Sequence, residues 1–393
     1  MYIHDLNCKW LNHPFALKSF MVNDAATMSK ILGIDVEEVY IDTELGTDIE
    51  ILSTHAPVKP GTVETKNSFS EPSSFISNLI PHLSPAEEFN RAISIYSNAN
   101  KMMLDMMQDI RLGKKITLKK CEPLVHEIVD SMFRFPSALL PIAQLKNRDE
   151  YTCQHAVSVS ALSVAFGRVL DLPLEDVKDI ALGGLLHDVG KALVPKRILN
   201  KPEKLDGEEF HIMKGHVLHT SKLLRDVKGM SDITYNAAAQ HHERFDGKGY
   251  PFGLSDDEIS LGGQIIAIAD TYDAITSLRA YRKAMPPTEA LKTLFDLSGK
   301  NFKSSLVQGF IKGIGIYPAG SLVRLETGSL GIVRKVTTDN VLKPVVQLIY
   351  DCQNKCPITP KMIDLSASSD KIISHESFEK WGIDQAKWAT VPS

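Results

Sequence analysis

The chain has few cysteines, and their spacing argues against both a disulfide framework and a zinc ribbon. Five cysteines occur among 393 residues, an odd number at irregular intervals. The closest pair, Cys352 and Cys356, is separated by three residues, one more than the zinc-ribbon spacing. We therefore expect all five to be reduced thiols that are mostly buried.

Long apolar runs and basic tracts are also missing. No stretch approaches the roughly 20 apolar residues of a membrane helix. Asp5, Lys9 and His13 interrupt the N-terminus where a signal peptide would have its apolar core. Acidic side chains outnumber basic ones, 48 to 44, so an extended surface for duplex nucleic acid is not expected. We expect a cytoplasmic protein that contacts no membrane and whose anionic ligand, if any, is small.

The sequence pattern changes three times along a chain that is too long for one ordinary core. Residues 1–58 mix short apolar strands with a helical segment, whereas residues 59–83 lack periodicity and predict a linker. Residues 84–316 have sustained helical periodicity, and residues 317–393 alternate between apolar and polar positions. The predicted fold class is multidomain α+β: a small α+β N-terminal domain, a central all-α bundle and a short β-rich C-terminal tail.

The first long helix has a clear start signal. Ser84 offers an N-cap, Pro85 suits the first turn, and Glu87 completes a capping box. Apolar residues, several of them methionine, then recur at helical spacing until Gly113. This face could pack in the core or form a seam between two subunits over residues 84–113, so a homodimer is one expectation.

Potential metal ligands are concentrated in the central region. Seven of the thirteen histidines lie between residues 155 and 242, where an even scatter would place about three. One histidine alone is more simply explained as a core or surface residue. Five of the seven, together with two aspartates, provide seven donors: His155, His187, Asp188, His216, His241, His242 and Asp270. Their long, similar intervals suit donors on successive antiparallel helices that face one bundle core. Nitrogen and oxygen donors without thiolate favour iron or manganese, and seven donors suffice for two ions.

The pair His187 and Asp188 lies at the centre of this pattern. Apolar residues 180–186 lead directly into it, and burying both groups is costly unless a cation pairs with them. Asp188 could bridge two ions with its two oxygens. Gly190 would relax the chain where it leaves the helix, and Lys191 would place an ammonium beside the metals.

Two longer motifs surround these donors: His187-Asp188-Val189-Gly190-Lys191 and His241-His242-Glu243-Arg244-Phe245-Asp246-Gly247-Lys248-Gly249-Tyr250-Pro251. Both strongly resemble motifs of the HD-GYP phosphodiesterases. The similarity covers about residues 148–312, and the N-terminal segment resembles a small domain of unknown role often found ahead of HD-GYP domains. HD-GYP proteins are bacterial helical hydrolases that open cyclic di-GMP to linear pGpG and often cleave that further to GMP. Some act on 3′,3′-cGAMP.

The resemblance implies an HD-type helical bundle that holds two divalent ions, iron or manganese. All seven donors would be metal ligands, with Asp188 bridging the ions and taking part in catalysis. Some relatives hold a third ion through a glutamate four residues before the first histidine, but that position is Tyr151 here. Lys191 would stabilise the charge that develops on the attacked phosphate. The substrate-binding residues would be Lys191, Tyr250, Asp273, Arg279 and Arg282.

Several alternatives stay open at this point. The substrate could be 3′,3′-cGAMP instead of cyclic di-GMP. A phosphohydrolase of nucleoside triphosphates or guanosine tetraphosphate could use the same His-Asp pair, although the Gly-Tyr-Pro segment argues against it. A sensor could bind a cyclic dinucleotide without hydrolysing it, although the intact donor set argues against that. Tyr250 could instead order its own loop, and Asp273 could orient a metal ligand.

Overall fold

The computed structural model describes residues 84–143, 151–277, 284–336, 341–385 and 388, with short pieces at 2–5, 20–22, 28, 31 and 39–41. The chain divides into two compact units, Met1–Leu79 and Ile80–Ser393. Arg279, Arg282 and the linker predicted at residues 59–83 lie outside the described residues. The domain boundaries taken from the sequence therefore stay predictions.

Three short strands form an antiparallel sheet in the N-terminal unit. They are β1 (Tyr2–Asp5), β2 (Phe20–Met21) and β3 (Tyr40–Ile41), in the order β2-β1-β3. Ile3 of the central strand pairs with Phe20 on one side and Ile41 on the other. The apolar segments around residues 20 and 40 thus form strands, as their composition predicts.

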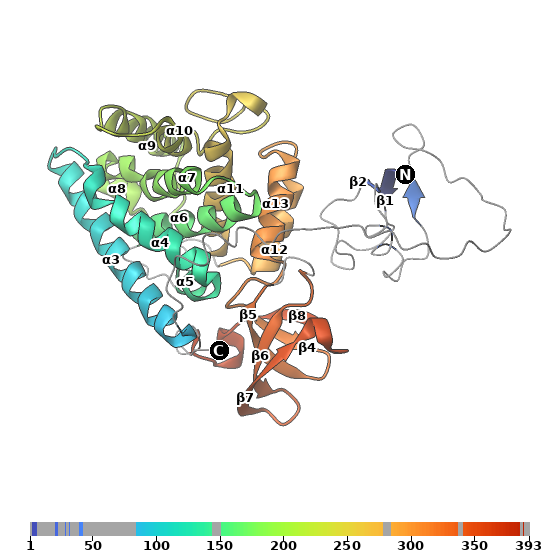
Figure 1. The fold of residues 1–393 in the computed structure, drawn as a ribbon. Helices are drawn as coiled ribbons and strands as arrows, with labels where there is room; N and C mark the ends of the chain where they lie inside the picture. The colour runs from blue at the N-terminus through green and yellow to red at the C-terminus, as the bar shows by residue number, and fades with distance from the viewer. Residues whose placement is uncertain are drawn as a thin grey trace, which may run out of the picture. The chain divides into compact units, whose positions relative to one another are not determined.

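The second unit contains a helical body followed by a sheet (Figure 1). Its helices are α3 (Pro85–Arg111), α4 (Glu122–Arg134), α5 (Pro136–Ala143), α6 (Tyr151–Val169), α7 (Leu174–Leu186), α8 (Lys196–Leu199), α9 (Gly207–Arg225), α10 (Asp232–Ala239), α11 (Leu261–Thr276), α12 (Pro287–Asp296) and α13 (Ser304–Ile314). Short 3-10 turns are η2 (Leu118–Lys120), η3 (Val189–Leu193) and η4 (Asp256–Glu258). None of the helices in the described part of the chain is long and apolar enough to cross a membrane.

Helix α3 begins at the predicted capping box and runs along one side of the helical body (Figure 1). Ser84 Oγ accepts a hydrogen bond from Glu87 N at 3.3 Å, and Glu87 Oε2 accepts one from Ser84 N at 2.8 Å. The apolar face of α3 packs on α4, α5 and α6 of the same chain, whereas Ile93 is 39% exposed. A homodimer stays a prediction, and it would need a surface other than this covered face.

Helix α6 forms the centre of the bundle. All its residues from Cys153 to Gly167 are buried because α3, α4, α5, α7, α11 and α13 surround it. Small side chains allow these neighbours to come close: a Cβ added to Gly184 of α7 would lie 3.2 Å from Ser160 Cα. His155, a predicted metal ligand, therefore lies on a helix that its neighbours enclose.

The C-terminal tail forms a five-stranded antiparallel sheet in the order β7-β6-β5-β4-β8. Its elements are β4 (Leu322–Leu325), β5 (Ser329–Lys335), β6 (Val345–Asp351), β7 (Cys356–Asp364), η5 (Leu365–Ala367), β8 (Ile372–Glu376) and η6 (Glu379–Trp381). Leu322, Leu330, Ile332 and Ile349 form its small core. The predicted fold class is confirmed: a helical HD fold carries a β-rich tail and follows a small N-terminal sheet.

Candidate metal centre

The predicted metal ligands come from five places that lie close together in the fold. His155 is on α6, His216 is on α9 and Asp270 is on α11. The other four donors do not lie within helices. His187 and Asp188 join the end of α7 to η3, and His241 and His242 follow the end of α10. The expectation that every donor lies within a helix is therefore met only in part.

Four buried imidazoles use their Nδ1 atoms within the protein. The four contacts are His155 Nδ1 with Asp273 Oδ2 at 2.5 Å, His187 Nδ1 with Gly184 O at 2.7 Å, His216 Nδ1 with Met213 O at 2.6 Å, and His241 Nδ1 with Ala238 O at 2.7 Å. Because carbonyl and carboxylate oxygens accept, each Nδ1 carries the proton and each Nε2 keeps a lone pair. Within the described chain all four Nε2 atoms are buried without a hydrogen-bond partner. A divalent cation satisfies such a set.

Asp188 lies between two groups of imidazoles, and each of its oxygens faces one of them. Oδ2 lies 3.2 Å from His187 Nε2 and 3.8 Å from His155 Nε2. Oδ1 lies 3.2 Å from His216 Nε2 and 4.0 Å from His241 Nε2, and has no hydrogen-bond partner among the described residues. The carboxylate is therefore oriented as a bridge between two sites would require.

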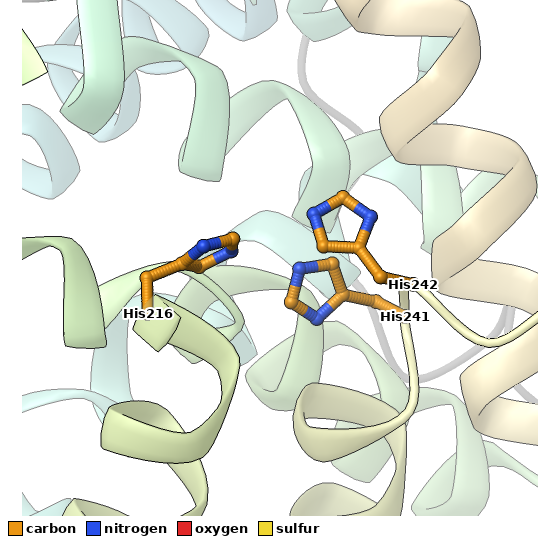
Figure 2. A group of neighbouring side chains, drawn as sticks. All are labelled: His216, His241 and His242. Atoms are coloured by element: carbon orange, nitrogen blue, oxygen red, sulfur yellow. The ribbon is translucent and has the colours of Figure 1, made fainter. Parts of the chain in front are cut away.

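The donors fall into two sets that are each compact enough for one ion. His155, His187 and Asp188 form the first, and His216, His241 and His242 form the second, with ligand atoms within 4.8 Å of one another in each. Figure 2 shows the second set, in which His216 points from its helix toward the paired rings of His241 and His242.

Asp270 adds a carboxylate that also faces both sets. Its Oδ1 lies 2.9 Å from His155 Nε2, and its Oδ2 lies 3.9 Å from His242 Nδ1. The structure thus brings all seven predicted donors together.

The environment keeps three of the donors, His241, His242 and Asp188, in the protonation states that metal binding needs. Burial lowers the pKa of His241 well below its ordinary value, and His242 and His187 lower it further. Burial also lowers the pKa of His242 to about 3, although Asp270 opposes the shift. Burial opposes the ionisation of Asp188, but His187 and Lys191 outweigh it and hold its pKa well below the ordinary value. At neutral pH the two adjacent histidines are neutral and the aspartate is charged.

Two side chains outside the donor set fix the position of His155. Asp273, predicted to contact substrate, is buried and accepts the hydrogen bond from His155 Nδ1. Its position favours the orienting role that the sequence left open. The Tyr151 ring stacks on the His155 ring, with centroids 5.6 Å apart and planes 10° apart. An aromatic ring therefore stands where some relatives have a third-ion glutamate.

A contact between η3 and α9, which was not predicted from the sequence, brings the two donor sets into register. A Cβ added to Gly190 would lie 2.0 Å from His216 O and 2.5 Å from Thr220 N. Gly190 is thus needed because the two backbones touch, and not to relax the chain as the sequence suggested. Thr220 Oγ1 accepts from Gly190 N and donates to His187 O, both at 3.0 Å. The only available signal was its position four residues after His216, on the same helix face.

The loop that contains the Gly-Tyr-Pro segment folds back onto the paired histidines. Glu243 is buried, and its carboxylate accepts hydrogen bonds from Phe252 N at 2.7 Å and Leu254 N at 3.0 Å. A Cβ added to Gly249 would lie 2.4 Å from Glu243 Cα. The Tyr250 ring consequently lies against His242, with centroids 4.7 Å apart. Tyr250 stands beside the donors and not among them.

Lys191 is the predicted catalytic cation, and it lies at the edge of the donor set. Its Nζ donates to Asp188 Oδ2 at 2.5 Å, and its side chain is 21% exposed. The ammonium can therefore stabilise the Asp188 carboxylate and still face solvent. The other two predicted cations, Arg279 and Arg282, lie outside the described residues.

Comparison with known proteins identifies two domain families in the chain. An HD domain matches residues 140–306, and a domain of unknown function, DUF3391, matches residues 1–121. The chain is 36% identical over 386 residues to a cyclic di-GMP phosphodiesterase of Pseudomonas aeruginosa. The match covers 97% of this chain and 90% of that protein.

Two further relatives share the HD region. A cyclic di-GMP phosphodiesterase of Thermotoga maritima is 36% identical over 204 residues, or 51% of this chain and 55% of the relative. A 3′,3′-cGAMP-specific phosphodiesterase of Vibrio cholerae is 37% identical over 157 residues, or 40% of this chain and 36% of the relative. The chain therefore belongs to the HD-GYP family of HD-domain phosphodiesterases, with a DUF3391 domain ahead of the HD domain.

Proposed function

We propose that this protein hydrolyses cyclic di-GMP to linear pGpG, and further to GMP, in bacterial second-messenger signalling. One observation carries the proposal. Four buried imidazoles turn unpaired Nε2 atoms toward the two oxygens of Asp188, while their Nδ1 atoms are held by the protein. The relative from Pseudomonas aeruginosa, which matches nearly the whole chain, is itself a cyclic di-GMP phosphodiesterase.

The donor geometry supports two divalent ions, iron or manganese. The absence of thiolates among the donors favours these metals, and the stacked Tyr151 ring beside His155 gives no carboxylate for a third ion. One ion would be held by His155, His187, Asp188 and Asp270, and the other by Asp188, His216, His241 and His242.

The chemistry is an in-line attack of water on one phosphodiester linkage. Two ions held by the seven donors would lower the pKa of a bound water and neutralise charge on the phosphate. Lys191 places a positive charge beside the phosphate as negative charge develops there. Arg279 and Arg282 hold phosphate oxygens through their forked donors. Tyr250, which packs on His242, orders the loop at the substrate side.

A second substrate, 3′,3′-cGAMP, is favoured by a specific observation. Three cGAMP-specific phosphodiesterases of Vibrio cholerae are 34–38% identical to the chain over their matched regions. Each match covers no more than 41% of this chain, whereas the match to the cyclic di-GMP phosphodiesterase of Pseudomonas aeruginosa covers 97%. Cyclic di-GMP is therefore the first substrate to test.

The test is purification without oxygen, loading with Fe(II) or Mn(II), metal counting and chromatography of each cyclic dinucleotide after incubation. The control pair is Asp188→Ala, which removes the bridge, and Asp226→Ala, which changes an exposed aspartate at the end of α9. We expect turnover in the parent and in Asp226→Ala, and none in Asp188→Ala. Equal turnover in Asp188→Ala, or no linear product from either dinucleotide, would refute the mechanism. Binding without product by protein that holds two ions would favour the sensor instead.

A further inference from the structure

A lysine and two aromatic rings extend outward from the metal centre. Lys214 precedes the metal ligand His216 by two residues on α9. Its Nζ lies 5.0 Å from the centroid of the Tyr250 ring and 4.8 Å from that of the Phe210 ring. Since the Tyr250 ring lies against His242, these side chains form a continuous row, which we call the aromatic row: His242, Tyr250, Lys214 and Phe210.

The charge of Lys214 is not paired with a carboxylate in the described part of the chain. Two other lysines of the helical body are paired, Lys191 with Asp188 and Lys201 with Glu209. Lys214 instead lies over two ring faces, which hold a cation with about 0.5–1 kcal/mol at an exposed site. Its three N–H donors are therefore available to a ligand that accepts hydrogen bonds.

Phe210 gives this row an open aromatic surface. It is 49% exposed, although a phenylalanine gains most by burial. Exposed aromatic rings next to a cation are the usual means by which proteins bind an unstacked nucleobase. The position of the row beside the metal centre points to the substrate and not to an unrelated ligand.

We propose that Phe210 and Lys214 form a guanine subsite that holds one base of the cyclic dinucleotide beside the metal centre. This rests on the proposed function. Guanine presents two acceptors on one edge, O6 and N7, and a lysine has only donors. Adenine presents a donor, its amino group, next to N7. Stacking on Phe210 holds either base, and Lys214 distinguishes guanine from adenine.

The subsite makes the two linkages of 3′,3′-cGAMP inequivalent. Hydrolysis breaks one P–O3′ bond, adds the hydroxyl of water to phosphorus and leaves the proton on O3′. The molecule has a single guanine, and binding that base at Lys214 presents one particular phosphodiester to the metals. The enzyme therefore forms one linear isomer, pApG or pGpA, in large excess from this dinucleotide.

The experiment compares metal-loaded parent protein with Lys214→Met and Phe210→Ala. The matched controls are Lys222→Met and Ile212→Ala, which change an exposed lysine and an exposed apolar side chain on the same helix. We expect KM for cyclic di-GMP to rise about tenfold in each test variant, the effect of losing one stacked or hydrogen-bonded base. Turnover number and bound metal stay within twofold of the parent. Lys214→Met also forms both linear isomers from 3′,3′-cGAMP, whereas Lys222→Met forms one.

Three results separate this proposal from the proposed function. If parent protein holding two ions binds cyclic di-GMP without cleaving it, the dissociation constant replaces KM, and a tenfold loss in Lys214→Met alone supports the subsite. If KM or the dissociation constant is the same in Lys214→Met and Lys222→Met, the subsite is wrong even when turnover is normal. If the turnover number falls while KM is unchanged, Lys214 acts elsewhere and the subsite is also wrong.

Discussion

The contact of Thr220 with η3 offers the sharpest test of how the fold positions the metal ligands. Thr220 on α9 is fully buried, and its hydroxyl accepts from Gly190 N and donates to His187 O. These bonds tie the helix that carries His216 to the segment that carries His187 and Asp188. Thr220→Val keeps the shape of the side chain and removes both bonds.

The size of the effect follows from the two groups that lose their partner. A buried backbone group without a hydrogen bond costs about 1–3 kcal/mol, so the loss of partners for two such groups should cost roughly 2–6 kcal/mol of unfolding free energy. A domain in the middle of the ordinary range of stability, about 5–15 kcal/mol, stays folded after such a loss. Side chains that support metal ligands typically contribute about 10–100-fold to metal affinity, and we expect roughly tenfold here because Thr220 acts through the backbone.

Thr234 provides a matched control at a site away from the metal ligands. It is also fully buried, and its hydroxyl accepts from Ser231 Oγ and donates to Asp179 O, both at 3.0 Å. Thr234→Val should therefore lose a similar unfolding free energy in urea without losing metal affinity. Both quantities are measured on each variant, with metal affinity determined by chelator competition at a temperature where circular dichroism shows both to be folded.

The comparison between the two variants decides whether the contact between η3 and α9 positions the metal ligands. If Thr220→Val binds metal as tightly as the parent, the contact between η3 and α9 does not position the ligands. If Thr234→Val loses as much metal affinity as Thr220→Val, the loss of metal affinity follows from the lower stability of the fold and not from the contact between η3 and α9. Either result would refute the reasoning.

Three other changes have expected outcomes. Asp273→Asn should weaken metal binding about tenfold, because an amide orients His155 less well than a carboxylate, and it should leave KM unchanged. A raised KM in a variant that keeps its full metal content would instead show that Asp273 contacts the substrate. The folded-state pKa values of His241 and His242 lie below their unfolded values, so metal-free protein should be most stable above about pH 6.5 and lose unfolding free energy as pH falls below it, as urea midpoints would show. A flat profile between about pH 7 and pH 4 would contradict this assignment. Gly249→Ala should displace the Gly-Tyr-Pro loop, because its Cβ would lie 2.4 Å from the backbone that follows His242, and turnover should fall while metal content is retained.

Local rules were sufficient for the elements whose signals lie within a few residues. Ser84 and Glu87 predicted the start of α3, and both capping hydrogen bonds are present. Alternation around Leu322 and Val345 predicted two strands of the C-terminal sheet. The seven donors were recognisable because their residue types are costly to bury and recur at long intervals. The cytoplasmic location stays a prediction.

Features that depend on tertiary contacts could not be predicted from the sequence. Ile93 fits the apolar period of α3 but is exposed, because periodicity does not state how wide a face the neighbouring helices cover. Asp273 lies one turn after Asp270, yet only the position of α6 shows that it binds His155 Nδ1. The site also depends on Gly190, whose role is decided by the distance between two backbones that are far apart in the sequence.

The two adjacent donor pairs explain why the helices end where they do. Neighbouring residues of an α-helix point about 100° apart, so His187 and Asp188, or His241 and His242, could not face one centre from within a helix. Asp188 leaves the helical conformation at φ −106° and ψ 8°, and Gln240 does so at φ −111° and ψ 3° just before the second pair. A backbone that turns so tightly must pack against its surroundings without side chains in the way. Gly190 and Gly249 meet that need, since a Cβ at either position would lie within 2.4 Å of neighbouring backbone. Each motif therefore combines adjacent donors with a nearby glycine for one physical reason: the donors require a break in the helix, and the break requires close backbone packing.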